Sequence, residues 1–495
     1  MNVASHPAGV VVFVTAANRS RLSRDAKAGR AMRLAAGVYA LAATLPAEAV
    51  AKHHRLAVIA HFWPGAVLSG RTALAGTAPV GGWMYVSHPN PARLTPVSLP
   101  GFRVAVEVGP GPLPGDMLMP SGLALSGRAR KLVENVHPQG RPANRRAGTA
   151  AVEDAIDELA RTGGTGAVTA VLAELEVVAS SFDHRLVEAV RARLVAVLGT
   201  KTINVSSARL KARLGGIPFD DHRVEMLAGL IQFLQTRSPE PRPVLGSPGR
   251  WTWLPFFEAY FSNFIEGTEF GVDEARRIAL EGEVPEGRPA DAHDVAATYR
   301  LASDPADRCR RATSEDDLLD VLRSQHGTLM AARPDKRPGQ FKELQNYAGG
   351  YQFVAPELVE GTLRRGFAAM AVLVDAFARA VAMMALITEC HPFDDGNGRL
   401  ARLMANAELT AAGEMRIVVP TVYRNNYLIS LSGFSNRSGI GESLTSVLAF
   451  AQRWVAAIDW ATFEGAKAQL EACNAFVDPG VGDATGQRLR LPPGP

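Results

Sequence analysis

An apolar run that leads into a glycine-rich turn is the feature that most constrains the fold of this chain. The run, residues 366–388, carries only two charged side chains, Asp375 and Arg379. Those charges leave it short of the roughly 20 uninterrupted apolar residues that cross a membrane, so we expect the buried central helix of a soluble domain. The chain continues as His391-Pro-Phe-Asp-Asp-Gly-Asn-Gly-Arg-Leu-Ala-Arg402 into an alanine-rich stretch that is also predicted to be helical.

The turn between these two helices has the composition of a polyphosphate site. Glycines on both sides of one polar residue let the backbone curl, so that successive N–H groups of Gly396, Asn397 and Gly398 point at an anion. Asp395, just before them, is predicted to hold Mg²⁺, because this ion takes few protein carboxylates and completes its shell with phosphate oxygens. The start of the following helix also favours negative charge.

Two arginines, a histidine and a phenylalanine complete the motif. Arg399 and Arg402 lie three residues apart, so both are expected to project near the helix N-terminus and grip phosphates. His391 is predicted to accept a proton near neutral pH. Phe393, between the base and the metal ligand, is predicted to anchor the loop in the core.

This run matches HPFx[D/E]GNGRxxR at every specified position, so the chain resembles the Fic family. The resemblance implies a nucleotidyltransferase, a protein adenylyltransferase that moves AMP from ATP to a Ser, Thr or Tyr hydroxyl of a target protein or of itself and releases pyrophosphate. Its substrate is then ATP and its metal Mg²⁺. Gly398 implies AMP transfer, because the related Doc branch has lysine there, binds the nucleotide reversed and presents the γ-phosphate.

An upstream segment matches the inhibitory pattern of the same family, [S/T]xxxE[G/N]. Its specified residues are Ser262, Glu266 and Gly267, in a helical stretch. The resemblance implies that Glu266 forms a salt bridge with Arg402 and so occupies the arginine that receives the γ-phosphate. An ordinary exposed helix acid is the alternative interpretation.

Residues 339–354 alternate polar and apolar side chains around a Gly-Gly pair, which predicts a β-hairpin. In Fic proteins a hairpin at this place, the flap, pairs with an extended segment of the target, although a purely structural hairpin is the alternative. The flap residues are Lys342, Tyr347, Gly349 and Gly350. Asn425 and Tyr427 are candidates for the nucleoside pocket by resemblance, with core packing as an equal alternative.

The N-terminal region contains a basic segment followed by a predicted hairpin. Residues 15–33 are predicted to form a basic helix that binds DNA phosphates and base edges in a winged helix-turn-helix, with an ordinary solvated helix as the alternative. Its basic residues are Arg19, Arg21, Arg24, Lys27, Arg30 and Arg33.

Residues 10–140 resemble, through loose motifs, the antitoxin of the abortive-infection (type IV) toxin-antitoxin class. The matching stretches are 29–39, 64–74, 84–87 and 126–132. The resemblance implies a DNA-binding winged helix joined to an α/β region, in which strands are expected at 83–87 and 102–108. A second function is therefore open: a DNA-binding regulator or antitoxin that carries the Fic module as toxin or sensor.

Helical periodicity and Pro/Gly-rich segments divide the chain. The expected fold is mostly α, with an all-α Fic domain that carries a β-hairpin flap, preceded by a helical connector and by a winged-helix plus small α/β region. The expected regions are 1–60 winged helix, 61–147 α/β, 148–240 connector, 250–460 Fic domain with its inhibitory helix, and 478–495 disordered tail.

Composition limits the kinds of partner, metal site and cellular compartment that we expect. A net charge of +4 indicates a local basic surface rather than a polyanion binder throughout. The cysteines have no CxxC spacing, which argues against a zinc site or a disulfide framework and favours a reducing, cytoplasmic compartment. The apolar run 10–14 is too short to span a membrane, so no membrane partner is expected. The three cysteines are Cys309, Cys390 and Cys473.

Overall fold

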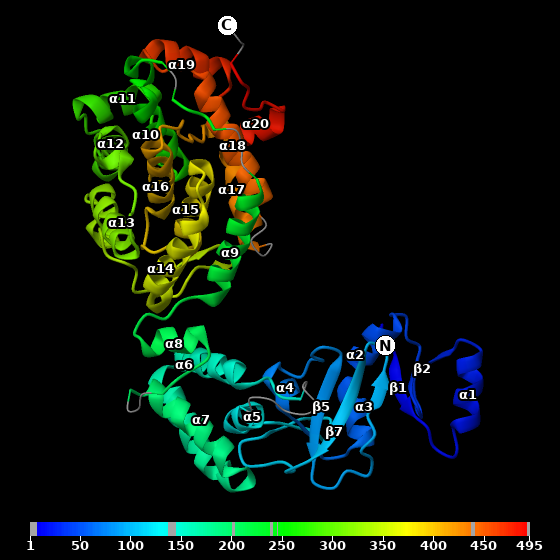
Figure 1. Cartoon of the computed structure of the whole chain (residues 1–495). Coiled ribbons are helices and arrows are strands. Elements are labelled where there is room, and N and C mark those ends of the chain that lie inside the picture. Colours follow the sequence, from blue (N-terminus) through cyan, green and yellow to red (C-terminus); the bar gives the residue numbers. More distant parts are fainter. Residues whose placement is uncertain are drawn as a thin grey trace. The chain divides into compact units, whose positions relative to one another are not determined.

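The structure is a computed structural model that describes residues 7–136, 145–199, 203–237, 241–244, 246–436 and 441–492. The chain divides into two compact units, Met1–Gly216 and Ile217–Pro495 (Figure 1). Helices dominate, as predicted, and strands are concentrated in the first unit. No helix in the described ranges is long and apolar enough to cross a membrane.

The first unit begins with a three-stranded antiparallel sheet in the order β1-β3-β2. Its elements are β1 (Val10–Phe13), α1 (Arg19–Lys27), β2 (Ala31–Ala35) and β3 (Val38–Leu41). The basic helix predicted at residues 15–33 is shorter in the structure, because α1 covers residues 19–27 and β2 begins at Ala31. The β-branched residues of β1 pair with β3, so a strand precedes α1.

A mixed six-stranded sheet follows, in the order β6-β7-β5-β4-β9-β8. The strands predicted at 83–87 and 102–108 are confirmed as β5 and β7, which pair in parallel. The elements are α2 (Ala47–His53), α3 (Arg55–Phe62), β4 (Val67–Leu68), α4 (Gly70–Leu74), β5 (Trp83–His88), β6 (Val97–Leu99), β7 (Phe102–Val108), β8 (Met117–Leu118), β9 (Ala124–Leu125) and α5 (Arg128–Asn135).

One hydrophobic core joins the two N-terminal sheets. Val38 of β3, Val58 and Ile59 of α3 and Val104 of β7 belong to the same buried cluster. Figure 1 shows α3 lying against β5 and β7. The expected boundary near residue 60 therefore does not separate two independent cores.

The helical connector is shorter than predicted. It comprises α6 (Thr149–Val178), α7 (His184–Val197) and α8 (Ala208–Leu214). The next helix, α9 (Asp221–Thr236), belongs to the second unit, because its apolar residues Leu227, Leu230 and Leu234 join the core built around the apolar run. The boundary thus lies at residues 216–217 rather than at 240.

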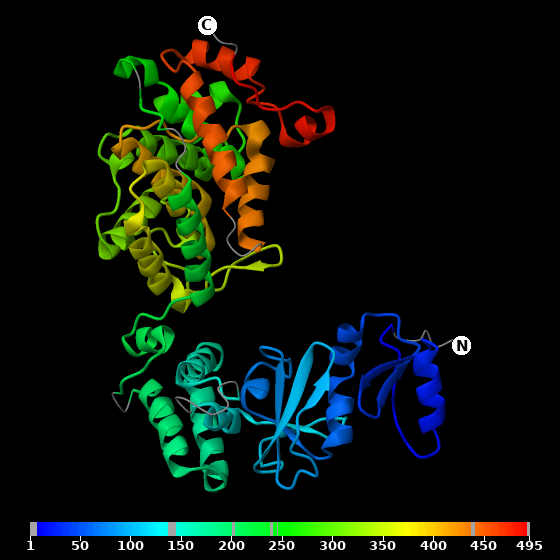
Figure 2. The ribbon, with the colours of Figure 1, turned by 45° about the vertical axis from the view of Figure 1, so that its right-hand side comes forward.

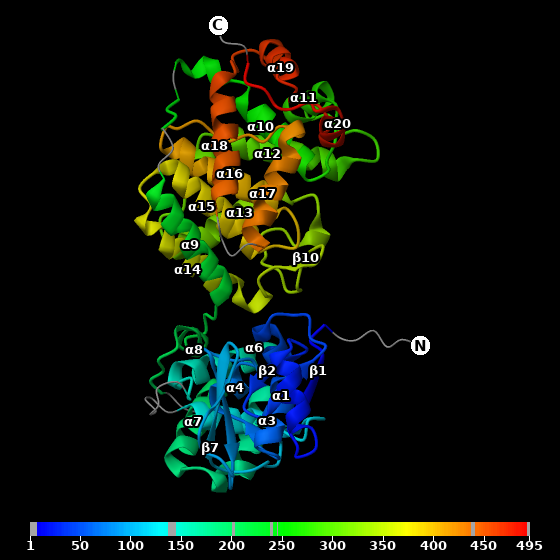
Figure 3. The same cartoon turned by 90° about the vertical axis from the view of Figure 1, so that its right-hand side faces the viewer.

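The second unit is a helical body with one hairpin. Its main elements are α10 (Leu254–Ile265), α11 (Val272–Glu281), α12 (Pro289–Ser303), α13 (Glu315–Leu329), β10 (Tyr347–Ala348), β11 (Tyr351–Gln352), α14 (Val359–Ala369), α15 (Ala376–Cys390), α16 (Asn397–Ala411), α17 (Arg424–Asn436), α18 (Glu442–Ala457), α19 (Phe463–Ala472) and α20 (Pro479–Thr485). Figure 2 shows the hairpin, in yellow-green, projecting from this body, and Figure 3 shows α17 beside α18.

The predicted central helix is α15, which is buried along nearly its whole length. The apolar run is nevertheless split, because Asp375 caps α15: its carboxylate accepts the N–H of Ala378 at 2.7 Å. Residues 366–369 end α14, and Val372 and Val374 in the intervening turn are exposed. The run is therefore two helices rather than one.

The described part of the C-terminal segment, residues 478–492, contains a helix where disorder was predicted. Asp478 caps α20 by accepting the N–H of Val481 at 3.0 Å, and Gly486 ends the helix in the left-handed conformation. Leu489 beyond it packs against the aromatic core around α10. A glycine- and proline-rich composition here encodes caps and turns, which is why composition alone gave the wrong expectation.

Candidate functional site

A cavity of about 310 Å³ in the second unit is lined by six of the seven residues predicted for catalysis, nucleotide binding and the metal. Its lining includes His391, Asp395, Arg402 and the backbone of residues 396–398. Glu266 and the flap residue Tyr351 also line it. The helix pair α15–α16 positions the loop, and the hairpin and α17 supply further walls.

His391 ends α15 in the left-handed conformation, with φ of +48°. Its Nδ1 lies 3.3 Å from the carbonyl oxygen of Thr388, which can only accept, so Nδ1 carries the proton and Nε2 is left as an acceptor. The ring stacks on Phe353 of the flap segment, with centroids 3.8 Å apart. Burial lowers the pKa of His391 to about 4, which keeps the imidazole neutral and basic at neutral pH.

The side chain of Asn397 fastens the loop after His391 at Phe393. Its Oδ1 accepts the N–H of Phe393 at 2.9 Å, and its Nδ2 donates to the carbonyl of Phe393 at 2.9 Å. Phe393 is fully buried, as predicted for an anchor. Both polar groups of the Asn397 side chain are thereby engaged, so what this residue offers to an anion is its backbone N–H.

The two aspartates of the motif have different environments. Asp394 is held by Arg337 through bonds of 2.9 and 3.1 Å. Asp395 lines the cavity, and its Oδ1 accepts the N–H of Gly396 at 2.6 Å. No group of three or more His, Cys, Asp or Glu that could hold a metal occurs within the described residues. A single oriented carboxylate beside a phosphate cradle fits Mg²⁺, which recruits phosphate oxygens for the rest of its shell.

Glu266 and Arg402 form an ion pair in the cavity, with 2.6 Å between Oε1 and the guanidinium. The same guanidinium donates to Oγ and to the carbonyl of Ser262 on α10, each at 2.9 Å. Burial alone lowers the pKa of Arg402, but the nearby Glu266 carboxylate and Tyr427 raise it above its ordinary value overall. Arg402 is therefore a buried cation whose partner is Glu266.

Two glycines make this contact possible. Gly267 has a φ of +87°, which turns the chain away after α10 and leaves Glu266 as the C-cap residue that directly follows Ile265. A Cβ on Gly398 would lie 2.2 Å from Oε1 of Glu266, which is closer than atoms can approach. A side chain at position 398 would therefore displace the Glu266 carboxylate from the place it holds beside Arg402.

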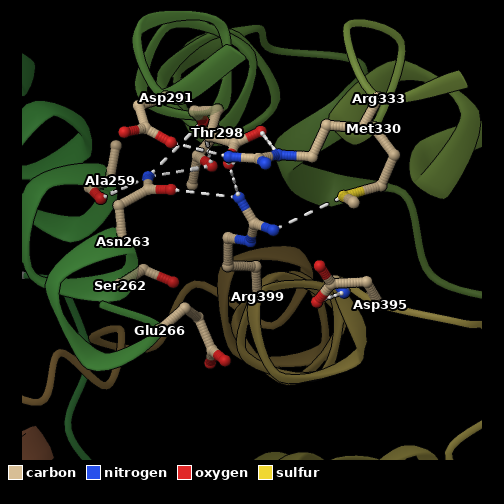
Figure 4. Close-up of polar contacts among 12 residues, drawn as sticks. Ala259, Ser262, Asn263, Glu266, Asp291, Thr298, Met330, Arg333, Asp395 and Arg399 are labelled. Carbon is tan, nitrogen blue, oxygen red and sulfur yellow. Dashed lines mark hydrogen bonds and ion pairs between the residues drawn. The ribbon is translucent and has the colours of Figure 1, made fainter. Parts of the chain in front are cut away.

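The structure does not bring Arg399, predicted as a phosphate ligand, to the cavity. Its guanidinium is 2.7 Å from the Asp294 carboxylate, 3.3 Å from Oδ1 of Asn263 and 3.4 Å from Sδ of Met330. Figure 4 shows this guanidinium among Asn263, Arg333 and Met330. Although three residues along a helix nearly complete a turn, the remaining offset of about 60° sends Arg399 and Arg402 to different partners.

Asp294 is the centre of a buried polar cluster. Arg333 donates to it at 2.8 Å, and Arg333 also pairs with Asp291 at 2.7 Å. Asn263 of α10 joins the cluster, since its Nδ2 donates to Oγ1 of Thr298 at 3.1 Å. The cluster holds two arginines and two aspartates, and it links α10, α12 and α16 (Figure 4).

We expect Arg399→Ala to destabilise the domain without weakening nucleotide binding by the folded protein. Removing one partner of a buried ion pair costs about 3–5 kcal/mol, and because Arg333 remains beside Asp294 the low end is expected. Urea unfolding measures the loss. Arg402→Ala is the matched control, in which nucleotide affinity falls. Equal loss of affinity in both variants would return Arg399 to the phosphate site.

The predicted flap hairpin is confirmed, with Gly349-Gly350 as its two-residue turn. Tyr347 is 61% exposed on its first strand. Lys342 instead is buried and anchors the base of the flap, because its Nζ donates to Oδ1 of Asn346 at 2.7 Å and to the carbonyl of Cys390 at 3.3 Å. Burial lowers the pKa of this lysine to about 8.

Of the two nucleoside-pocket candidates, the structure brings one to the cavity. Tyr427 is buried and lines it. Asn425 lies on the outer side of α17, where its Nδ2 donates to Asp483 of α20 at 2.8 Å. The residues of α17 that line the cavity lie later in the helix. Sequence periodicity could not identify them, because the residue at which the helix begins was not known. They are Leu428, Leu431, Ser432, Ser435 and Asn436.

Several cavity residues escaped sequence reasoning. Glu389 of α15 is buried and accepts from the hydroxyls of Tyr351 and Ser435, each at 2.5 Å. This contact ties the flap strand β11 to α17. A carboxylate within a mostly apolar helix, two residues before the motif histidine, was the available signal.

The six basic residues proposed for DNA are all exposed. Those at positions 19–27 lie on α1, Arg30 follows it and Arg33 lies on β2. Arg30 pairs with Asp25 at 2.8 Å. The antitoxin resemblance and the DNA-binding function stay predictions.

Comparison with known proteins locates one family within the chain. A model of the Fic/DOC family matches residues 316–409. Protein adenylyltransferase fic-1 of Caenorhabditis elegans is 26% identical over 185 residues, which cover 36% of this chain and 36% of that protein. The Caenorhabditis briggsae protein of the same name is 28% identical over 187 residues, with the same coverage. The chain thus aligns with about a third of the length of these relatives.

Among solved structures, Fic-1 from C. elegans aligns with 61% of this chain and 84% of its own, at 18% identity and a TM-score of 0.36. The family match spans α13, the flap, α15 and nearly all of α16, and therefore includes the whole His391–Arg402 loop described above. Residues 316–409 of this chain are thus the part that is similar to the Fic/DOC family.

Proposed function

We propose that the chain is a protein adenylyltransferase that transfers AMP from Mg-ATP to a Ser, Thr or Tyr hydroxyl of a target protein. One observation carries the proposal: a single cavity contains a histidine with its Nε2 free to accept, an oriented carboxylate, three successive glycine-loop amides and a buried arginine. A proton acceptor and a polyphosphate cradle in one site are what hydroxyl attack on a nucleotide requires.

In the proposed reaction the target hydroxyl attacks the α-phosphorus in line with the bridging oxygen to the β-phosphate. The new O–P bond forms as the bridging bond breaks, and pyrophosphate leaves with the bonding electrons. The hydroxyl proton passes to Nε2 of His391, which is neutral because of its burial. The backbone N–H groups of Asn397 and Gly398 stabilise charge on the phosphates, while that of Gly396 holds the Asp395 carboxylate.

Asp395 is the residue that would hold Mg²⁺, which supplies neutralisation of phosphate charge. Arg402 is the group left to bind the terminal phosphate, and in this structure Glu266 engages it. A carboxylate at that position both occupies the guanidinium and repels the phosphate. The proposed resting enzyme is therefore inhibited.

The flap would present the target. Its exposed short strands can add an extended target segment by main-chain hydrogen bonds, which depend little on sequence. Phe353, at the end of the flap segment, stacks on His391, so a movement of the flap would also move the ring that accepts the proton. An exposed segment of the enzyme itself is an equally suitable target for the same pairing.

The Glu266→Gly protein, incubated with lysate and labelled ATP, tests the reaction. We expect label from the α-phosphate to appear on protein and label from the γ-phosphate to be released as pyrophosphate. Mass spectrometry then identifies hydroxyl side chains that carry AMP. Protein labelled from the γ position would show phosphate transfer and overturn the proposal.

A further inference from the structure

His326 of α13 makes a two-sided contact that the proposed mechanism does not use. Its ring is fully buried. Nδ1 accepts the N–H of Gly339 at 2.9 Å, and Nε2 lies 3.0 Å from the carbonyl oxygen of Asp395. A backbone N–H can only donate and a carbonyl can only accept, so the ring is the neutral tautomer with its proton on Nε2.

The contact with Asp395 fixes the orientation of one peptide group. A trans peptide is planar, and its C=O and N–H point in opposite directions. Because His326 holds the carbonyl of Asp395, the N–H of Gly396 in the same peptide points the other way. There it donates to Oδ1 of Asp395 at 2.6 Å. One imidazole therefore sets the first amide of the phosphate loop and, through it, the carboxylate.

The surroundings of His326 make this orientation rigid. The ring stacks on Phe393 with centroids 3.7 Å apart and planes within 7°. A Cβ on Gly396 would lie 2.8 Å from Sδ of Met330 and 3.5 Å from Cδ2 of His326. His326 of α13 and Met330, which directly follows this helix, thus pack closely against the loop at Gly396.

We propose that His326 is a positioning residue for the phosphate site, which acts through the Asp395–Gly396 peptide. Its other contact, with Gly339, joins this peptide to the start of the flap segment. The inference rests on the proposed function for the identity of the ligand, whereas the orientation of the loop is a property of the free protein. An experiment can therefore contradict the role of His326 without contradicting the proposed function, and the reverse.

The asparagine and glutamine variants separate the two nitrogens. Glutamine places its amide near the position of Nε2 and can donate to Asp395, while asparagine reaches only the position of Nδ1. His326→Phe keeps the stacking on Phe393 and removes both polar contacts. Each change is made in full-length chain that also carries Glu266→Gly and His391→Ala, so that ATP binds without turnover.

Calorimetry with ATP, with and without Mg²⁺, measures the effect. We expect His326→Phe and His326→Asn to weaken Mg-ATP binding about 10- to 100-fold, as loss of a partner behind a metal ligand typically does. His326→Gln is expected to recover most of the affinity. Equal affinity of the asparagine and glutamine variants, at equal thermal stability, would overturn the proposal.

Two readouts need no nucleotide. The ¹⁵N spectrum of the His326 ring in the free protein is expected to show a protonated Nε2, and hydrogen exchange of the 393–398 amides is expected to quicken in His326→Phe and His326→Asn but not in His326→Gln. A protonated Nδ1 would overturn the inference even if AMP transfer were proved. Normal ring and exchange results with no ATP binding would instead count against the proposed function alone.

Discussion

Replacing His391 with alanine in the Glu266→Gly protein is expected to lower AMP transfer about 10²- to 10⁴-fold, the usual contribution of a general base. The reason is that Nε2 of His391 is the neutral acceptor in the cavity, since the proton sits on Nδ1 beside Thr388. Initial rates with α-labelled ATP measure the loss. His184→Ala, at a side chain that is 85% exposed on α7, is the control and leaves the rate unchanged.

The pH profile tests the same assignment. Burial lowers the pKa of His391 to about 4, so the basic form persists as the pH falls from 7.5 to about 5 and is lost only near pH 4. We expect a nearly flat rate across the upper range. A fall centred near the ordinary histidine pKa of about 6.5 would show that the base is not buried during the reaction. Retained activity in His391→Ala would remove it from the chemistry.

Glu266→Gly is expected to raise AMP transfer about 10- to 100-fold. Its carboxylate makes a charge-assisted hydrogen bond of 2.6 Å to Arg402, a class of contact worth about 1.5–3 kcal/mol, and each 1.4 kcal/mol corresponds to a factor of ten. Rates and nucleotide affinity, measured side by side, report the gain. Arg402 keeps two bonds to Ser262 in this variant, so the fold should survive.

Two variants control for this result. Glu266→Gln keeps the length of the side chain and removes its charge, so an intermediate gain is expected. Glu269→Gly removes an exposed carboxylate three residues away and is expected to change nothing. If Glu266→Gly left the rate unchanged while His391→Ala abolished it, inhibition by this chain's own α10 would be rejected.

Local sequence carried the parts of the site that depend on neighbours along the chain. Some parts of the site depend only on residues a few positions away: the left-handed glycines, the two-residue hairpin turn and the bonds of Asn397 to Phe393. Local sequence patterns therefore located the loop and the flap. The Glu266–Arg402 pair spans 136 residues, and it was expected only because the upstream pattern resembles a family's inhibitory helix.

Contacts between distant helices were not accessible in this way. Arg399 was assigned to phosphate because nothing in the local pattern indicates Asp294, which lies on another helix and offers a buried counterion. His326 was passed over for the same reason, since a single histidine in an amphipathic helix gives no sign of the loop it supports. The sequence could not show that Asn425 lies outside the cavity, because the start of α17, and hence its outward face, depends on tertiary packing.

The buried position of Asn263 separates the control of this site from the stability of its fold. Asn263 precedes Glu266 by less than one turn of α10, and it is fastened to Thr298 and Arg399 inside the charged cluster. Pulling the helix away would open that cluster to water, whereas turning one glutamate side chain at the helix end would not. Activation by a signal can thus be rapid and reversible, and thermal melting would be a poor way to screen for molecules that cause it.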